Sequence, residues 1–263
     1  MEPGPAGWGR PLYEWVLDAL GTVSGGPLLD VGCGAGELCR LAVDRGMSVR
    51  GVDASPGVLA AAAQLVPEAE LLTGALPSLP IPDRTAAAVT CVQVLMHVPN
   101  PVAALRELAR VARPGAPVVV TVWGPVEQCA FGAFGRALAP FLSGPPRADG
   151  LPRAGGARGN GARGGRRTGE PPPLTAPGRL AKLAGLAGLA SAQVEDVRCP
   201  FDYPDDRALL AGLYAAEVGR RAVAVAGGRA PVRKAILAGL AVYRTASGGY
   251  RLENTFRVLA ARA

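Results

Sequence analysis

The chain is poor in the residues that build metal and redox sites. It has a single histidine, His97, and five cysteines that form no C-x-x-C pair: Cys33, Cys39, Cys91, Cys129 and Cys199. A structural zinc needs about four clustered nitrogen, sulfur or oxygen ligands, so we expect no metal. We expect the scattered thiols to be reduced and mostly to serve as small buried apolar side chains.

Long apolar runs are missing as well. No stretch approaches the roughly 20 apolar residues that span a bilayer. The N-terminal residues lack a basic region followed by an apolar one, so no signal peptide is expected. With 263 residues, 49% of them apolar, the chain has a globular composition and enough length to bury a core. We therefore expect a soluble cytoplasmic protein that has no membrane partner.

The net charge of +7 is concentrated in one segment. Residues 144–173 are rich in arginine, glycine and proline and contain almost nothing to bury, which predicts a flexible loop. The rest of the chain is only mildly basic, so no nucleic-acid partner is expected. The Arg-Gly clusters nevertheless resemble RNA-binding segments, and an RNA-binding role through this loop stays open as an alternative.

Strand-like and helix-like segments alternate along the first half of the chain. We expect a helix over 11–20, strands over 27–31, 48–52, 70–73, 86–94 and 118–123, and helices over 37–45, 56–66 and 101–112. This alternation predicts a parallel sheet with helices on both faces. A helix is then expected over 126–142. Beyond the loop we expect a helix after 174, a strand over 192–199, helices over 205–218 and 231–243, and a strand over 250–260.

The most regular stretch is LLDVGCGAGELCRLA, residues 28–42. Gly32, Gly34 and Gly36 fall where the first strand turns into a helix. Glycines there let a ligand touch the backbone, and the following helix directs free N–H groups at that ligand. Asp53 ends the next strand, where a carboxylate can accept both hydroxyls of a ribose. The pattern therefore indicates a nucleoside ligand.

Two classes of nucleoside ligand are candidates for this loop. Dinucleotides need G-x-G-x-x-G, but the third glycine comes one residue early here and Glu37 takes its place. Asp30, directly before the loop, would repel a pyrophosphate and would suit a cationic amino group. The loop therefore favours a nucleoside that carries an amino acid, S-adenosylmethionine (SAM), over NAD(P).

Taken together, these motifs resemble the class I SAM-dependent methyltransferases that act on small molecules (methyltransferase type 11-like). The resemblance is carried by LLDVGCGAG, VRGVDASPGVL, LPSLPIPD and VLMHVPNPVAALRELARVARPGAPVVVTVWG. It is strong over 11–124 and weak over 174–193 and 249–262. It implies an α/β, Rossmann-like fold whose seven-stranded, mostly parallel sheet has helices on both faces. It also implies a single domain over 1–263 with a helical lid at about 200–245.

The resemblance further implies a set of SAM-binding residues: Asp30, Gly32, Cys33, Gly34, Asp53, Ala54, Ala75, Leu76 and Val92. Those from Asp30 to Gly34 would hold the methionine part, and Val92 would line that end of the pocket. Asp53 would hold the ribose, with Ala54, Ala75 and Leu76 around the adenine. The chain departs from the family pattern at Ala75, often an acid, and at Ala86-Ala87, which replace Phe-Asp.

The chemistry implied is transfer of the SAM methyl group to an oxygen, nitrogen or carbon atom of a small molecule. His97 is the candidate general base, because it follows the fourth strand on the ligand side of the sheet. Gln93 and Trp123 are expected to shape the pocket, and the segments outside the strong core to select the acceptor, including the N-terminal helix with Tyr13. A monomer or homodimer is expected. A degenerate fold that binds SAM without catalysis and an NAD(P)-dependent oxidoreductase remain the alternatives.

Overall fold

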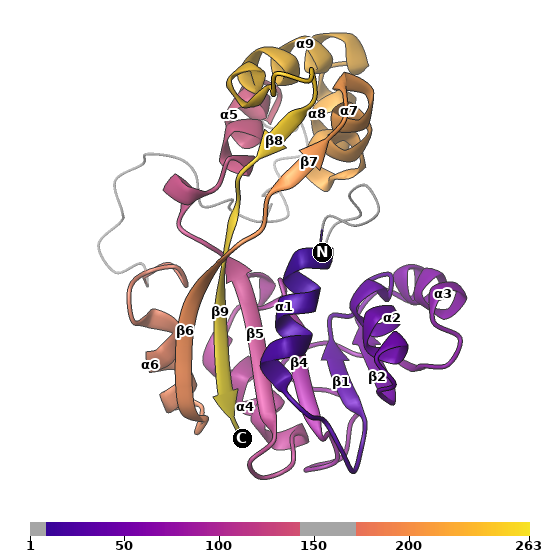
Figure 1. Ribbon diagram of the computed structural model, residues 1–263, viewed down its shortest axis with the longest axis vertical. Coiled ribbons are helices and arrows are strands. Elements are labelled where there is room, and N and C mark those ends of the chain that lie inside the picture. Colours follow the sequence, from indigo (N-terminus) through magenta and orange to yellow (C-terminus); the bar gives the residue numbers. More distant parts are fainter. Residues whose placement is uncertain (1–8, 143–171) are drawn as a thin grey trace, which may run out of the picture.

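The structure is a computed structural model that describes residues 9–142 and 172–263 (Figure 1). The loop expected at 144–173 lies outside the described residues except for its last two positions. Within the described part of the chain, no helix has the length and apolar character needed to cross a membrane.

The base of the molecule is a seven-stranded sheet in the order β3-β2-β1-β4-β5-β9-β6. Its strands are β1 (Leu28–Val31), β2 (Val49–Asp53), β3 (Glu70–Thr73), β4 (Ala88–Val92), β5 (Pro117–Trp123), β6 (Ala190–Arg198) and β9 (Thr255–Arg262). Strand β9 is antiparallel to both of its neighbours, and the other pairs are parallel. The expected mostly parallel, Rossmann-like sheet is thereby confirmed. Strand order reverses between β1 and β4, the place where such sheets bind ligands.

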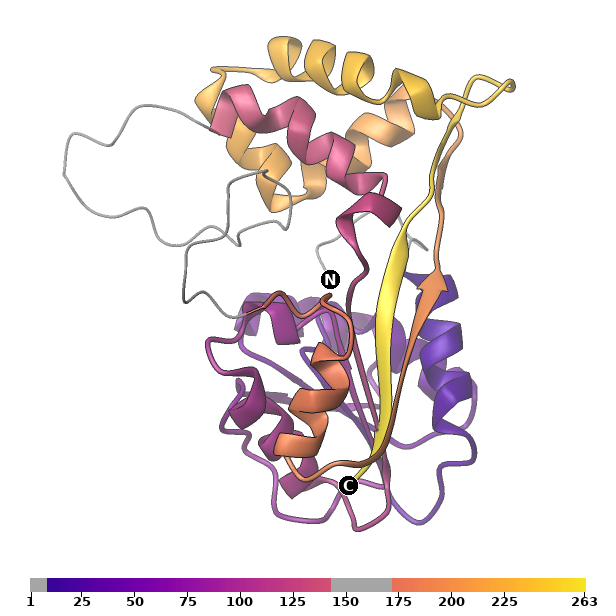
Figure 2. The ribbon, with the colours of Figure 1, turned by 90° about the vertical axis from the view of Figure 1, so that its left-hand side faces the viewer.

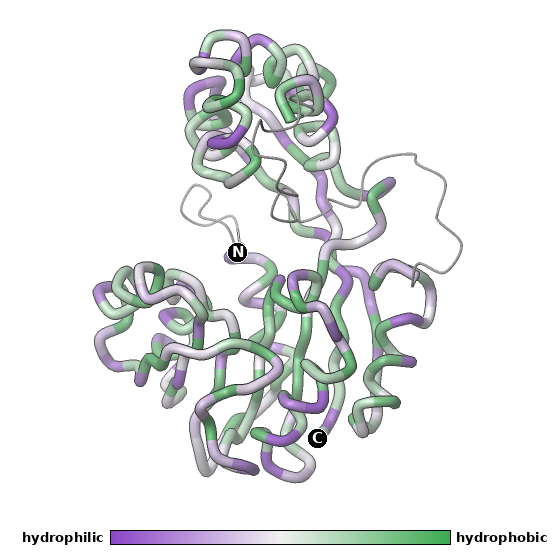
Figure 3. Tube along the Cα trace, turned by 180° about the vertical axis from the view of Figure 1, so that it is seen from behind, coloured by the Kyte–Doolittle hydropathy of each residue, from purple (hydrophilic) through white to green (hydrophobic). Residues whose placement is uncertain are grey.

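Helices cover both faces of the sheet, as expected. One face packs against α1 (Arg10–Leu20), α2 (Glu37–Asp44) and α3 (Pro56–Leu65), and the other against α4 (Pro101–Val111) and α6 (Arg179–Leu186). Figure 2 shows α1 and α6 on opposite sides of the sheet. Along β5, Val119 faces the α1 side while Val118 and Val120 face α4, because side chains alternate along a strand. Much of the trace through the middle of the sheet is green, and therefore hydrophobic, in Figure 3.

Local sequence explains where several helices begin. Helix α4 starts at Pro101 after Asn100, whose side chain accepts the N–H of Ala103 at 3.1 Å. Proline suits the first helical position because it lacks an N–H that would have no partner there. Helix α3 starts in the same way at Pro56 after Ser55. However, the Ser55 side chain makes no capping hydrogen bond. Ser55 therefore occupies the N-cap position without stabilising the first turn of the helix through its side chain.

A second group of elements lies beyond the carboxyl ends of the parallel strands (Figure 1). We call it the helical cap. It consists of α5 (Phe131–Leu142), α7 (Asp206–Ala215), α8 (Glu217–Val225), α9 (Arg229–Gly239) and a two-stranded ribbon of β7 (Phe201–Tyr203) and β8 (Tyr250–Leu252). The described residues also form three short 3-10 helices: η1 (Leu95–His97), η2 (Val126–Gln128) and η3 (Ala241–Tyr243).

Asn254 holds the junction between the sheet and the helical cap. It is 1% exposed. Its side-chain oxygen accepts the N–H of Phe131 at 2.9 Å, and its side-chain nitrogen donates to the carbonyl of Leu252 at 3.0 Å. Its own carbonyl accepts the N–H of Cys199 at 2.8 Å. One side chain and its backbone thus connect β8, β9, the start of α5 and the link between β6 and β7.

Three sequence expectations for this region are wrong. The helix expected over 126–142 is the turn η2 followed by α5, because the N–H groups of Ala130 and Phe131 are held by Glu253 and Asn254. The strand expected over 250–260 is divided at 253–254 into β8 and β9 by the same contacts. Helix α8 was missed between the two helices expected over 205–218 and 231–243.

Candidate functional site

The glycine loop connects β1 to α2 at the point where strand order reverses. Gly32, Gly34 and Gly36 have φ values of +75°, +57° and +88°. At Gly32 a Cβ atom would overlap the side chain of Val94, which follows β4. The loop therefore needs glycine both for its left-handed backbone and for its close approach to the end of β4. At these three glycines the backbone of the turn carries no side chain that would keep a ligand away from it.

Asp53 connects this loop to the end of β2. Its Oδ2 accepts the N–H of Gly34 at 3.0 Å and its Oδ1 accepts the N–H of Ser55 at 2.9 Å. The side chain is half-buried. Because each carboxylate oxygen can accept two hydrogen bonds, both oxygens retain acceptor capacity for hydroxyl groups. Asp53 thus fixes the loop and can also bind a ribose.

Asp30 is buried directly below the glycine loop, with 2% of its surface exposed. Oδ1 accepts the hydroxyl of Thr90 at 2.8 Å, and Oδ2 accepts the thiol of Cys39 at 3.5 Å. Burial raises the pKa of Asp30 to about 6, although the hydrogen bonds from Thr90 and Cys39 act in the opposite direction. A buried carboxylate is stabilised in its charged form by a nearby cation. The site therefore favours a ligand with a positively charged group at this end.

Polar side chains form a row across three strands on the α1 side of the sheet. Asp30 and Thr90 are paired in the β1–β4 register, and Val92 is paired with Thr121 between β4 and β5. Thr90 and Thr121 are fully buried. Neither threonine is among the site residues expected from the sequence, although each interrupts an otherwise apolar strand, in AVTCV and PVVVTVW. A lone polar residue in such a strand is the signal that could have identified them.

Gln93 follows β4 at the end of this row. Its φ of +59° is unusual for a residue other than glycine. Its side chain is 6% exposed, and its Nε2 donates to the hydroxyl of Thr121 at 3.0 Å. Val92, expected at the methionine end of the pocket, is buried immediately before it. The structure thus places both residues at the carboxyl end of β4, where Val94 contacts the glycine loop.

The residues expected around the adenine follow β2 and β3. Ala54 and Ala75 are exposed and Leu76 is half-buried. Asp53 and Thr73 are paired in register, and the N–H of Gly74 donates to the carbonyl of Asp53 at 3.0 Å. The segments that hold Ala54 and Ala75 therefore leave the sheet side by side. Neither alanine offers a side-chain hydrogen bond to an adenine.

Glu107 anchors the segment that carries Ala75 and Leu76, a role we had not predicted. Its Oε1 accepts the N–H of Leu79 at 2.6 Å. Arg110 donates to Glu107 at 2.7 Å and also to the carbonyls of Leu79 and Ile81, at 3.3 and 2.9 Å. The hydrogen bond from Arg110 is the main reason why the pKa of Glu107 is lowered. The border of the site on this side is thus fixed from α4.

Tyr13, which we expected to help select the acceptor, is buried instead. It is 6% exposed, and its hydroxyl donates to Oε2 of Glu37 at 3.1 Å. Burial and the neighbouring Glu37 hold the pKa of Tyr13 well above its usual value. Its contact therefore joins α1 to the first turn of α2, directly behind the glycine loop.

His97 lies in η1, four residues after Gln93. Its imidazole is exposed, and the backbone N–H of His97 donates to the carbonyl of Val94 at 2.8 Å to close the turn. The structure thus places His97 after β4, as the sequence predicted. Its role as a general base stays a prediction.

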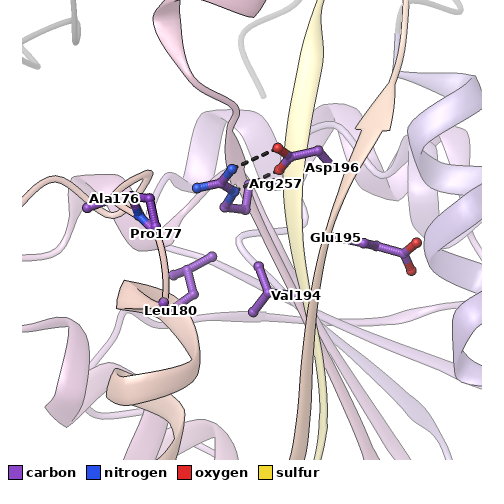
Figure 4. Close-up of a pocket in the computed structure, with 8 residues that line it drawn as sticks. Ala176, Pro177, Leu180, Val194, Glu195, Asp196 and Arg257 are labelled. Atoms are coloured by element: carbon purple, nitrogen blue, oxygen red, sulfur yellow. Dashed lines mark hydrogen bonds and ion pairs between the residues drawn. The ribbon is translucent and has the colours of Figure 1, made fainter.

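Two hollows lie away from these residues. One, of about 240 Å³, is lined by Leu180, Val194, Asp196, Arg257 and neighbouring residues (Figure 4). There the guanidinium of Arg257 donates to both oxygens of Asp196, at 2.7 Å each, so its charge is already balanced. The other, of about 310 Å³, lies between 23–27 and 46–48. In the described chain, no three His, Cys, Asp or Glu side chains gather as metal ligands.

Comparison with known proteins agrees with the geometry of the loop. Residues 29–120 match the family model described as a methyltransferase domain. This part of the chain, about a third of its length, is therefore similar to a methyltransferase domain. The matched range contains every residue predicted to bind SAM, from Asp30 to Val92.

Curated relatives share this methyltransferase domain. A ubiquinone biosynthesis O-methyltransferase of Alkalilimnicola ehrlichii is 34% identical over 127 residues, covering 44% of this chain and 51% of that protein. A demethylmenaquinone methyltransferase of Renibacterium salmoninarum is 33% identical over 127 residues, covering 48% and 52%. The chain thus spans about half the length of the curated relatives it matches.

Among solved structures, the YcgJ protein of Bacillus subtilis has the same fold. The two structures superpose with a TM-score of 0.61 at 16% sequence identity, over 96% of this chain and 98% of YcgJ. The fold is therefore shared well beyond the methyltransferase domain, including the second half of the chain.

Proposed function

We propose that this chain binds SAM and transfers its methyl group to a small organic acceptor. The proposal is carried by the two carboxylates on either side of the glycine loop. Asp30 is buried on β1 and favours a cation, while Asp53 on β2 is half-buried and can accept hydroxyl groups. A nucleoside that carries a charged amino acid matches both ends, whereas a pyrophosphate would be repelled by Asp30.

The residues of the site fit SAM in chemistry and position. Asp30 would balance the charge of the ammonium group, and the backbone of Gly32, Cys33 and Gly34 would contact the methionine part. Asp53 would accept the ribose hydroxyls. When bound, SAM supplies a methyl group that its sulfonium has already activated. The main tasks of the chain are therefore to hold the two reactants in line and to exclude water.

The acceptor is proposed to bind between the ends of β4 and β5 and the helical cap. The relatives named above include an O-methyltransferase of ubiquinone biosynthesis and a demethylmenaquinone methyltransferase, which supports a small organic acceptor for this chain. The helical cap would act as its lid, with residues 1–263 working as one domain, alone or as a homodimer. His97 is the candidate base for an oxygen or nitrogen acceptor, and no nucleic acid takes part.

Calorimetric titration with S-adenosylhomocysteine (SAH) tests the proposal without knowledge of the acceptor. We expect micromolar binding of SAH and none of NAD or NADP. Asp53→Ala should weaken SAH binding by at least about tenfold, since hydrogen bonds to a charged group contribute about 1.5–3 kcal/mol. Asp44→Ala, the same change at an exposed carboxylate on α2, is the control.

Tighter binding of NAD or NADP than of SAH would overturn the proposal in favour of an oxidoreductase. SAH binding without SAM turnover on any of a broad panel of small acceptors would favour a domain that binds SAM without catalysis. Loss of SAH binding in Asp44→Ala to the same degree as in Asp53→Ala would remove the assigned role of Asp53.

A further inference from the structure

Gln93 is the least satisfied buried polar residue near the proposed methyl-transfer site. In the part of the chain that the structure describes, its amide oxygen Oε1 is buried and has no hydrogen-bond partner. The residue also adopts a left-handed backbone conformation, with φ at +59°. Strain and unpaired buried polar atoms persist where the surroundings impose them, and they gather at functional sites.

Thr121 holds the Gln93 side chain from β5. The hydroxyl of Thr121 accepts hydrogen bonds from Nε2 and from the backbone N–H of Gln93, at 3.0 and 3.2 Å. In this orientation Oε1 and the second N–H of the amide have no partner among the described residues, and exchanging the oxygen and nitrogen would leave two N–H donors without one instead. The orientation in the structure is the one that directs an acceptor, Oε1, away from Thr121. What Gln93 offers to a ligand is thus a hydrogen-bond acceptor, Oε1, on an amide held by Thr121.

The side chain leans toward β5 and away from the glycine loop. Strand β4 lies between β1 and β5 in the sheet, and the Gln93 amide is bonded to β5. A ligand that meets Oε1 is therefore on the acceptor side of the reaction centre. The ammonium end of SAM is assigned instead to Asp30 on β1.

An aromatic surface lies on the same face of β5 as Thr121, the residue that holds the Gln93 amide. Trp123 follows Thr121 by two residues on β5, so both side chains lie on the same face of the strand. The Trp123 ring stacks on Phe131, with 5.3 Å between ring centroids and 12° between ring planes, and it also packs against Phe256 at 4.7 Å. Trp123 and Phe131 are only partly buried. A flat ring can therefore pack against their exposed parts.

We propose that the methyl acceptor is an aromatic compound with a hydroxyl group, which donates its hydroxyl hydrogen to Oε1 of Gln93 while its ring packs against Trp123. This inference rests on the proposed function and names the substrate class of the same site. Gln93 binds and orients the acceptor, and as a neutral amide it takes no proton. Selection against compounds without the hydroxyl follows, because they would leave Oε1 buried and unpaired.

The test compares two probes that differ only at the hydroxyl: 2-naphthol and 2-methoxynaphthalene. Each is titrated by ligand-observed NMR against the full chain saturated with SAH. We expect the wild type to bind 2-naphthol about tenfold more tightly than 2-methoxynaphthalene. Gln93→Met, which keeps the length and removes the oxygen, should bind the two probes within about twofold of each other. Trp123→Leu should weaken both probes by a similar factor.

Gln64→Met on the exposed side of α3 is the matched control, and it should retain the full preference for 2-naphthol. Thr121→Val is a second variant, in case Gln93→Met does not fold. It keeps Oε1 but removes its anchor, so the preference should decrease. The SAH affinity of each folded variant should stay within about threefold of the wild-type value.

Equal binding of the two probes by the wild type would overturn the inference, and so would failure of both probes to bind. A preference that survives unchanged in Gln93→Met, or in Thr121→Val when Gln93→Met does not fold, would also overturn it. Any of these results with SAH still bound would leave the proposed function standing. Failure of SAH to bind the wild type would overturn the proposed function itself, together with this inference.

Discussion

The buried carboxylate of Asp30 should make ligand binding depend on pH in the weakly acidic range. The pKa of this group is raised to about 6 in the ligand-free protein because it is buried. If the carboxylate balances the ammonium group of SAH, the bound ligand stabilises the charged form. Binding must then weaken as the pH falls and Asp30 becomes protonated.

The size of the effect follows from the pKa of Asp30. Above pH 7 most of the carboxylate is ionised, and at pH 5 only about one molecule in ten is, because the ratio changes tenfold per unit. The dissociation constant of SAH should therefore rise about tenfold between pH 7.5 and pH 5.0. Calorimetry at intervals of half a pH unit measures this. Asp30→Asn should bind SAH weakly at pH 7.5 and show little change across the same range.

The same pKa predicts the sign of a stability change. The folded-state pKa of Asp30, about 6, lies above its ordinary value of 3.8. The folded state therefore binds the proton more tightly, and stability falls as the pH rises from about 4 through 6. The difference is equivalent to about 3 kcal/mol, at 1.36 kcal/mol per pKa unit. Ligand-free Asp30→Asn should gain up to about that amount at pH 8 and nothing below pH 4, as measured by urea denaturation.

Two results would refute this reasoning. One is a wild-type SAH affinity that does not change between pH 7.5 and 5.0. The other is an Asp30→Asn variant that binds SAH as tightly as the wild type with the same pH profile. Either would mean that Asp30 is a buried structural acid rather than the partner of a cation.

Three substitutions test the framework around the site. Gly32→Ala should lower the free energy of unfolding by more than Gly46→Ala. Both glycines have φ above +70°, but only at Gly32 would a Cβ meet another side chain, and equal losses would disprove the steric argument. Glu107→Ala should cost about 1–3 kcal/mol in thermal denaturation by leaving the N–H of Leu79 without its partner, and a change under about 0.5 kcal/mol would contradict this. Asn254→Ala should cost a similar amount in urea denaturation, and an unchanged midpoint would show that the junction tolerates unpaired groups.

The sheet and the glycine loop could be predicted because local sequence specifies both. Strand and helix patterns alternate with short connections from Arg10 to Trp123, and few topologies satisfy that order. The glycine spacing and the acids Asp30 and Asp53 then indicate one ligand class. The structure puts these acids at the ends of adjacent strands, although their roles in binding are still predictions.

The helical cap was predicted less well because contacts between distant segments define it. Helix α5 begins at Phe131 only because Asn254, more than a hundred residues later, accepts its N–H. Strands β7 and β8 have three residues each and are stable as a pair. No local pattern of such short segments distinguishes them from loop.

The hydrogen-bond partners of side chains within the site could not be predicted from the sequence for the same reason. The hydrogen bonds from Tyr13 to Glu37 and from Thr90 to Asp30 join residues 24 and 60 positions apart. Spacing in the sequence cannot pair such residues. The unpaired oxygen of Gln93 is likewise visible only once every neighbouring group has been placed.

The junction at Asn254 has a consequence for protein engineering. The sheet and the helical cap meet where this one residue holds a few backbone groups. Strand β9 begins its pairing with β5 and β6 directly after it. We expect caps from other proteins of this fold to be transplantable at that boundary if they retain an asparagine in the same place. Exchanging the helical cap in this way would change the proposed acceptor-binding side of the site and leave the glycine loop and its two carboxylates unchanged.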